Sequence, residues 1–165
     1  MQRTKAFLLS VVLLTAVWLL LTYPFSVPEL IAGVVAAVVI SLLPSGAAEV
    51  LREIRVSPRA AAAAIAYLFV FLFALVRANL DVAFRVLKPS LPIAPGIVRI
   101  QTSLKTPLAR MLLANSITLT PGTITVDARD DVFYVHWISV AEQDIEQATK
   151  RIVGNFERYL EVFLG

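Results

Sequence analysis

The chain has 165 residues, of which 58% are hydrophobic and 16% charged, and its mean hydropathy is +0.78. Soluble domains carry about a quarter of charged residues, so this composition indicates a membrane protein. The formal charge of +3 divides into +4 for residues 1–88 and −1 for residues 89–165, which argues against a nucleic-acid-binding face on the more polar half. Because the chain has no cysteine, disulfides, thiolate catalysis and cysteine metal sites are excluded.

Three apolar segments, residues 6–22, 27–43 and 60–76, are each about 17 residues long. That length is near the lower limit for crossing a bilayer, so the sequence predicts three transmembrane helices. The motif YPFSVP joins the first two, and its two prolines predict a tight helical hairpin. No small-residue cleavage site follows the first segment, which we therefore expect to be a retained anchor rather than a signal peptide.

The third segment continues as a helix towards residue 88. Arg77, Asp81 and Arg85 are four residues apart and therefore lie along one stripe of that helix. One interpretation is a solvated ion-pair ladder at the end of a membrane helix. The other is that the stripe faces protein at the membrane border and binds a neighbouring subunit. Since Pro89 disfavours helical geometry at Lys88, we divide the chain into a transmembrane region, 1–88, and a polar domain, 89–165.

Membrane orientation follows from the distribution of basic residues. Five basic residues lie before the first apolar segment or between the second and third, and three lie after the third. With three crossings, these two groups face opposite sides of the membrane. This difference favours an amino terminus inside and a polar domain outside the cell. The five are Arg3, Lys5, Arg52, Arg55 and Arg59, and the three are Arg77, Arg85 and Lys88.

The polar domain begins with alternating residues that predict a strand over 97–103. A short helix follows, with Thr106 at its N-cap and Pro107 as its first residue. The stretch Asn115–Asp127, NSITLTPGTITVD, places β-branched residues on both sides of Pro121-Gly122. Proline followed by glycine suits positions i+1 and i+2 of a type II turn, so this stretch predicts a β-hairpin or a tight strand connection.

Residues 132–138, VFYVHWI, are apolar on both faces and predict a central strand, with Phe133, Val135 and Trp137 on one face. Ser139 and Glu142 have the spacing of a capping box, and an amphipathic helix then runs to about Phe163. The predicted fold class is therefore α-helical membrane protein with a small carboxy-terminal α+β domain of β-α-β-β-α order. A core this small is marginal, so the domain is expected to dock against other protein.

The residue types required for catalysis do not assemble into a recognisable site. His136 is the only histidine and lies in an aromatic strand, where a packing role is more common than ligation. No metal-ligand set, phosphate loop or nucleophile motif is present, so we expect no metal, no cofactor and no enzymatic activity. Glu29 is the only charge within the apolar segments, and it stands close to the start of the second one.

Three blocks carry a family resemblance that extends over essentially the whole chain: RANLDVAFRVLKPSLPIAPGIVRIQTSL, LLANSITLTPGTITVD and FYVHWI. They resemble the E-type small subunit of the multisubunit cation/proton antiporters called Mrp or Mnh. The resemblance implies an accessory subunit of a Na⁺/H⁺ antiporter in a prokaryotic cell membrane, with large complex-I-like subunits and small membrane subunits as partners. It also implies a cytoplasmic polar domain, against the charge distribution. Equivalent subunits of membrane-bound hydrogenase-type complexes share these motifs, and this alternative stays open.

Three hypotheses follow for the chain's role. In the first, it braces an assembly of membrane subunits. In the second, Glu29 and Asp81 line part of an ion path at a subunit boundary, and in the third the chain is a stand-alone, membrane-anchored binding domain. The first hypothesis assigns interface or structural roles to Arg77, Asp81, Arg85, Asn115, Thr120, Pro121, Gly122 and His136.

Overall fold

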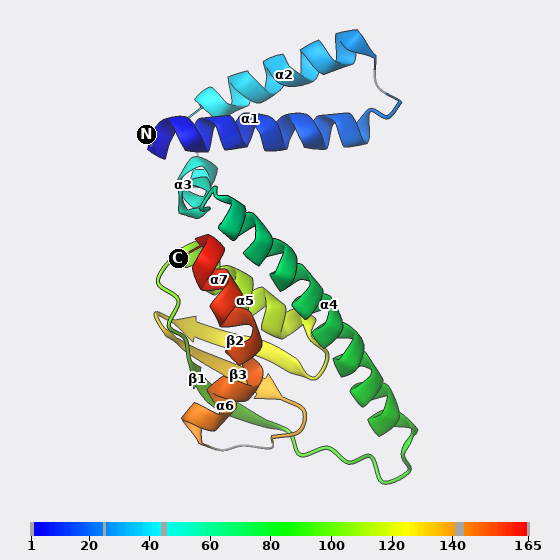
Figure 1. Cartoon of the computed structure of the whole chain (residues 1–165). Coiled ribbons are helices and arrows are strands. Elements are labelled where there is room, and N and C mark those ends of the chain that lie inside the picture. Colours follow the sequence, from blue (N-terminus) through cyan, green and yellow to red (C-terminus); the bar gives the residue numbers. More distant parts are fainter. Residues whose placement is uncertain (1, 25, 44–45, 141–143, 165) are drawn as a thin grey trace. The chain divides into compact units, whose positions relative to one another are not determined.

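The computed structural model describes residues 2–24, 26–43, 46–140 and 144–164 (Figure 1). The chain divides into two compact units, Met1–Ile54 and Arg55–Gly165. The sequence analysis instead placed its boundary after residue 88. The two divisions differ because the third apolar helix packs against the α/β elements that follow it.

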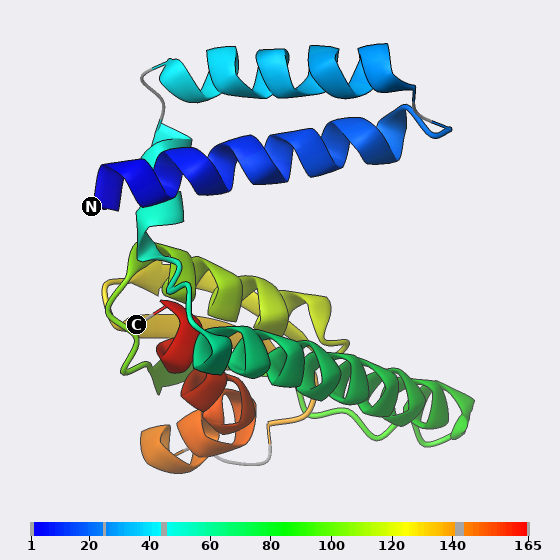
Figure 2. The same cartoon turned by 45° about the horizontal axis from the view of Figure 1, so that its top comes forward.

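The first unit contains two helices that pack side by side, α1 (Gln2–Leu21) and α2 (Val27–Leu42), as Figure 2 shows. This is the predicted helical hairpin. Small residues allow the close approach: a Cβ added to Gly33 of α2 would lie 2.5 Å from Cδ1 of Trp18 in α1. Ala6 and Ala37 are likewise almost fully buried. Small residues at a helix–helix contact are typical of membrane helices.

A short helix, α3 (Gly46–Glu53), completes the first unit and was not predicted from the sequence. It lies in the segment that the sequence analysis treated as a loop between apolar helices. Lys5 Nζ donates a hydrogen bond to the carbonyl oxygen of Ile54, just beyond the end of α3. This contact ties the end of α3 to the start of α1.

The second unit begins with α4 (Pro58–Leu87), a continuous helix of 30 residues. The Ser57 side chain accepts a hydrogen bond from the Ala60 amide at 3.1 Å, and Pro58 takes the first helical position. The helix therefore has the N-terminal signals that favour this start. It includes both the predicted apolar segment and its predicted extension, and it ends before Pro89.

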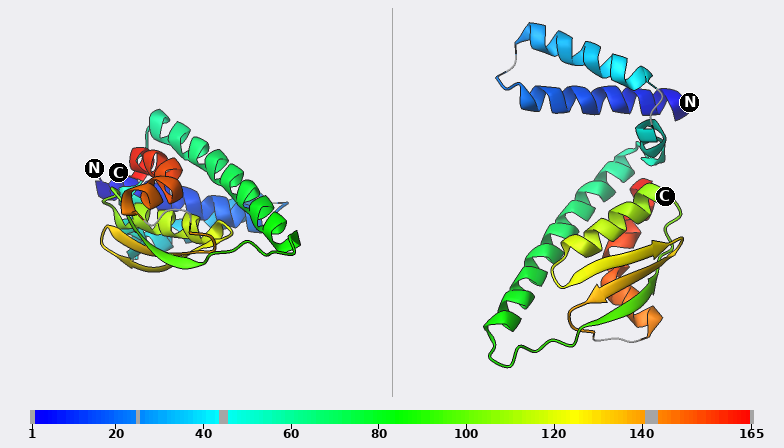
Figure 3. Two further views of the ribbon diagram at one scale, coloured as in Figure 1. Left: turned by 90° about the horizontal axis from the view of Figure 1, so that it is seen from below. Right: turned by 180° about the vertical axis from the view of Figure 1, so that it is seen from behind.

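A three-stranded antiparallel sheet follows, made of β1 (Gly96–Gln101), β2 (Thr123–Arg129) and β3 (Val132–Trp137). The strand order is β1-β3-β2, so the prediction that β3 is central is confirmed. Three helices, α5 (Pro107–Leu119), α6 (Ile145–Ile152) and α7 (Gly154–Leu164), lie over one face of the sheet (Figure 3). The predicted β-α-β-β-α order is present, with two helices at its end.

The core lies between this face of the sheet and the helices. The register pairs Val98 with Val135 and Ile100 with Phe133, and all four side chains are buried. The helices add the buried side chains Leu113, Ile117, Leu160 and Leu164. The opposite face of the sheet is open: Ile97, Ile124 and Val126 are 63%, 53% and 58% exposed.

The prediction of a strand in the first part of Asn115–Asp127 is wrong, because α5 continues to Leu119. In α5, Leu113, Ser116 and Ile117 are buried at helical spacing, so tertiary packing overrides the β preference of the threonines and isoleucine. The second part of the stretch forms β2 as expected. Thr125 at its centre donates a side-chain hydrogen bond to the Ala114 carbonyl at 3.1 Å, which fixes β2 against α5.

The final helix is divided into α6 and α7, although the sequence predicted one continuous helix. Val153 caps α6 and is fully buried, and α7 starts at Gly154. The N-cap of α6 is Asp144, whose carboxylate accepts from the Gln147 amide at 3.2 Å. The predicted capping box starts earlier, and its Glu142 lies outside the described residues.

Replacement of Phe133 by alanine tests the assignment of the core face. The lost ring should leave a cavity and lower the free energy of unfolding of the second unit by about 3–5 kcal/mol. Ile97→Ala, on the open face, should change it by less than about 0.5 kcal/mol. Urea unfolding of the full chain in detergent, followed by Trp137 fluorescence in a Trp18→Phe background, measures both. Equal losses would contradict this assignment.

Candidate functional site

The amino-terminal half of α4 packs tightly on α7. The Tyr67 ring lies 6.2 Å from Phe156 and 5.7 Å from Phe163 between centroids. Its hydroxyl is hydrogen-bonded to Oγ of Ser116 in α5. Because the Ser116 hydroxyl donates to the Leu112 carbonyl at 2.7 Å, it accepts from Tyr67. The hydrogen bond holds α4 against α5, and the ring packing holds it against α7.

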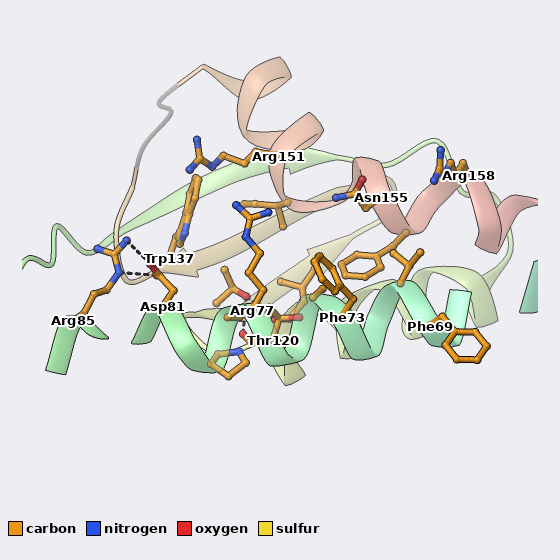
Figure 4. Close-up of a pocket in the computed structure, with 18 residues that line it drawn as sticks. Phe69, Phe73, Arg77, Asp81, Arg85, Thr120, Trp137, Arg151, Asn155 and Arg158 are labelled. Carbon is orange, nitrogen blue, oxygen red and sulfur yellow. Dashed lines mark hydrogen bonds and ion pairs between the residues drawn. The ribbon is translucent and has the colours of Figure 1, made fainter. Parts of the chain in front are cut away.

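Beyond this contact, a groove of about 610 Å³ lies between α4 and the domain. Its apolar walls come from α4 and from the α6–α7 segment, and the Thr120–Thr123 turn and Trp137 complete it. Figure 4 shows these side chains around the groove. The lining residues on α4 include Phe69, Val70, Phe73, Ala74, Arg77, Ala78, Asp81 and Arg85.

Among the described residues that line it, the groove is basic: Arg77, Arg85, Arg151 and Arg158 stand with one carboxylate, that of Asp81. Figure 4 shows the Arg77 side chain extending from α4 into the groove. The Arg151 guanidinium lies 5.6 Å from the centroid of the Trp137 ring, a cation–π arrangement. Planar guanidinium groups in a partly apolar groove are suited to binding carboxylates or phosphates.

Asp81 and Arg85 form the ion pair that their spacing suggested. Arg85 Nε lies 2.7 Å from Asp81 Oδ2, and Arg85 Nη1 donates to the Pro92 carbonyl at 2.7 Å. The Asp81 side chain is 57% exposed, so the pair contributes at most about 1 kcal/mol. The predicted stripe faces the domain of its own chain across the groove.

The turn that borders the groove requires glycine. Gly122 has φ of +92°, and the Thr123 amide donates to the Thr120 carbonyl at 3.2 Å. A Cβ at Gly122 would lie 2.9 Å from Ile138 Cγ2 and 3.7 Å from Val82 Cγ2 of α4. The predicted Pro121-Gly122 turn is therefore present, and it links the end of α5 to β2 beneath α4.

The structure brings together five of the eight predicted interface or structural residues. Arg77, Asp81, Arg85, Thr120 and Pro121 line the groove, and Gly122 shapes the turn beside it. Asn115 is exposed on α5, outside the groove lining. His136 lies on the open face of the sheet, in register with Ile97 and Ile124.

Glu29, the other residue suggested for an ion path, caps a helix. Its carboxylate accepts the Ser26 amide at 2.6 Å and completes a capping box at the start of α2. Glu29 lies in the first unit, whereas Asp81 lies in the second. In the part of the chain that the structure describes, no three His, Asp or Glu side chains are grouped to hold a metal ion.

Sequence reasoning missed several residues of the groove and its border: Tyr67, Ser116, Trp137, Arg151 and Arg158. Tyr67 had a usable signal, since a lone phenol within an apolar segment needs a buried hydrogen-bond partner. The arginines had no comparable signal. They reach the groove only because α6 and α7 meet beside β3.

A second, more open hollow of about 970 Å³ lies around the end of β1 and the β2–β3 turn. Gln101 Nε2 donates to Asp131 Oδ2 at 2.8 Å, and this hydrogen bond holds the pKa of Asp131 below its usual value. Asp131 therefore stays ionised to lower pH than a free aspartate. The hollow's lining mixes carboxylates with Lys105, Arg110 and Lys150, so it offers no single charge preference.

Comparison with known proteins assigns the chain to a family. The sequence model of MNHE, described as Na⁺/H⁺ ion antiporter subunit, matches residues 11–162. The chain belongs to this family. The resemblance inferred from the sequence blocks is thereby confirmed.

The MNHE relatives match the chain over part of its length. The E-type Na⁺/H⁺ antiporter subunit of Alkalihalophilus pseudofirmus is 40% identical over 96 residues, 58% of this chain and 61% of the relative. The corresponding E1-type antiporter subunit of Staphylococcus aureus is 41% identical over 86 residues, 50% of this chain and 54% of the relative. The alignments thus span little more than half of each curated relative.

A chain in the solved structure of the membrane-bound sulfane sulfur reductase, an archaeal respiratory membrane complex, has a similar fold. It is 39% identical, with a TM-score of 0.83, and the match covers 96% of this chain and 98% of that one. The MNHE chain and this chain of the respiratory complex therefore share one fold over nearly their whole lengths.

A glycine-to-alanine pair tests the turn beside the groove. Gly122→Ala should lower the free energy of unfolding by about 1–3 kcal/mol, because alanine is strained at positive φ. Gly154→Ala is the matched control: the nearest atom to its added Cβ is 3.9 Å away, so stability should be unchanged or higher. Chemical unfolding of both variants in detergent gives the free energy of unfolding that tests this prediction. A harmless Gly122→Ala would mean that the turn is formed differently.

Proposed function

We propose that this MNHE chain is an accessory subunit of a multisubunit Na⁺/H⁺ antiporter in a prokaryotic cell membrane. Its role is to hold membrane subunits together rather than to carry ions. The family match over residues 11–162 is the observation that carries the proposal. The proposed partners are large complex-I-like subunits, other small membrane subunits and the surrounding lipid.

The arrangement of charges supports a structural role. In the hairpin of α1 and α2, the charged residues are Arg3 and Lys5 near the start of α1 and Glu29 in the first turn of α2. None stands at the middle of a helix, where proton-relay residues of transporters occur. Glu29 and Asp81 each have a local partner that accounts for their positions, a helix cap and an ion pair.

The hairpin supplies the proposed membrane anchor. Arg3–Leu21 is long and apolar enough to cross a bilayer, whereas Val27–Leu42 is shorter. A helix of 20 residues spans about 30 Å, close to the thickness of the hydrocarbon core. Large apolar side chains such as Leu13, Leu20 and Ile31 are 48%, 81% and 59% exposed, which favours contact with lipid or with other membrane helices. The α/β domain is proposed to be cytoplasmic, as the family resemblance implies.

One observation favours a second candidate function. The chain of the sulfane sulfur reductase shares this fold over 96% of the present chain, at 39% identity. A respiratory ion-pumping complex is therefore the alternative host. Affinity purification of the tagged chain in mild detergent, followed by mass spectrometry, distinguishes the two, because redox subunits accompany the chain only in the second case.

Asp81→Asn separates the structural role from an ion path. If Asp81 only pairs with Arg85, each assembled complex should exchange Na⁺ for H⁺ at the wild-type rate in liposomes. Asp127→Asn is the matched control, because Asp127 forms a comparable exposed ion pair with Arg129 at 2.7 Å, in β2. Loss of exchange per complex in Asp81→Asn alone, with normal assembly, would instead support the ion path.

The Pro121→Ala/Gly122→Ala double variant should have the complementary effect. Because the turn supports both α5 and α4, its disruption should reduce the amount of assembled complex more than the exchange rate of each complex. Quantitative mass spectrometry of purified complexes, combined with liposome assays, measures both. Normal amounts of complex with lost exchange would contradict an accessory role.

A further inference from the structure

Helix α4 has one face that packs on the domain and an opposite face that the domain leaves uncovered. On the face towards the domain, Ala60, Ala63 and Tyr67 are buried, and Asp81 and Arg85 follow along the same side. The opposite face carries an outer ridge of apolar side chains. The ridge consists of Ile65, Leu68, Leu72, Val76, Leu80 and Leu87, which are 45–78% exposed.

By length and composition, Pro58–Leu87 is a candidate membrane span, but its packing is incompatible with crossing. The Arg55 amide donates to the Phe163 carbonyl at 2.8 Å, and Phe71 lies 6.4 Å from Phe156 between centroids. Helix α7 therefore runs antiparallel beside the first half of α4. If α4 crossed the bilayer, α7 would lie at the same depth in the hydrocarbon.

The elements beside α4 are unsuited to hydrocarbon. Arg158 and Glu161 of α7 are exposed, and charges at the bilayer centre are rare and costly. β1 and β2 are the edge strands of the sheet, and only some of their outer backbone groups are satisfied, such as the Gln101 amide by Thr149 and the Thr125 amide by Thr118, so the other edge groups would lack partners in lipid.

We propose that α4 lies in the plane of the membrane surface, with its outer ridge in the acyl-chain boundary and the α/β domain on its aqueous side. An interfacial helix buries one apolar face in the headgroup–acyl boundary; in α4 that face is the ridge, and the opposite face is covered by the α/β domain instead of by water. This assignment replaces the third membrane crossing predicted from the sequence. It does not depend on which complex the chain joins.

Lipid, rather than another subunit, is the partner that the ridge fits. The ridge is apolar along its length, whereas protein interfaces mix apolar cores with polar groups. Asn79 lies beside the ridge, but its side-chain amide donates to the Leu75 carbonyl at 2.8 Å and so has a partner within the helix. Exposed cations, Arg59 and Lys88, stand at the two ends of α4. Basic residues at the membrane surface are attracted to anionic headgroups.

Site-directed spin labelling tests the proposal directly, because the chain has no native cysteine. Single cysteines at Ile65, Leu72, Val76, Leu80 and Leu87 are labelled in the full-length chain. Each protein is reconstituted into vesicles of zwitterionic and anionic phospholipids. Collision rates with oxygen, which partitions into lipid, and with a water-soluble nickel complex give the depth of each label.

An interfacial α4 predicts the same shallow depth at all five positions, each with greater access to oxygen than to nickel. Arg129→Cys, in the exposed end of β2, is the water-accessible control. A crossing helix would instead give depths that differ widely along the ridge, with the 60–76 segment predicted from the sequence placing Ile65 and Leu72 deepest and Leu87 shallowest, and such a gradient would overturn the proposal. Ridge labels as accessible to nickel as the control would also overturn it. Unchanged circular dichroism spectra identify the variants that fold normally.

Discussion

The packing of Tyr67 between α5 and α7 is the contact on which the second unit depends. It buries a phenol against Phe156 and Phe163 and satisfies its hydroxyl through Ser116. An unpaired hydroxyl in this position would be costly, so the contact specifies one placement of α4 on the domain. The groove exists because α4 is held closely at this end. The second unit begins at Arg55, before α4, because α4 and the α/β domain share one core.

The packing of α4 on the domain also shows that an apolar helix of this chain need not be surrounded by lipid. Hydropathy alone does not distinguish a helix surrounded by lipid from a helix with lipid on one side and protein on the other. In α1 and α2 the exposed apolar residues lie around the helices, whereas in α4 many of them form the ridge opposite the domain and others, such as Phe69 and Phe73, line the groove. The charged residues Arg77, Asp81 and Arg85 of α4 lie on the side of the helix that faces the domain, where they line the basic groove. A chain built in this way can join a membrane hairpin to an aqueous domain, which suits an accessory subunit of a larger assembly.

Local patterns predicted much of the fold because they are set by neighbouring residues. Proline and N-cap signals placed the start of α5, alternation placed β1, a run of β-branched and aromatic residues placed β3, and Pro121-Gly122 placed the turn. The failures have tertiary causes. The β-branched residues before Pro121 are helical because Ser116 and Ile117 are buried beneath α4 and β2. Arg151 and Arg158 were not assigned to the site, since nothing in their local sequence shows that α6 and α7 bring them to the groove. No sequence pattern indicated that the third apolar helix packs on the domain.

A double-mutant cycle between Tyr67 and Ser116 most directly tests whether α4 belongs to the domain. The two residues are 49 positions apart and belong to different helices, so energetic coupling between them requires the proposed packing. Unfolding free energies of wild type, Tyr67→Phe, Ser116→Ala and the double variant, measured in the full chain, give the coupling energy. The account predicts a favourable coupling of about 0.5–1.5 kcal/mol, the net value of a buried hydrogen bond. A coupling of zero, with both single variants folded, would contradict it.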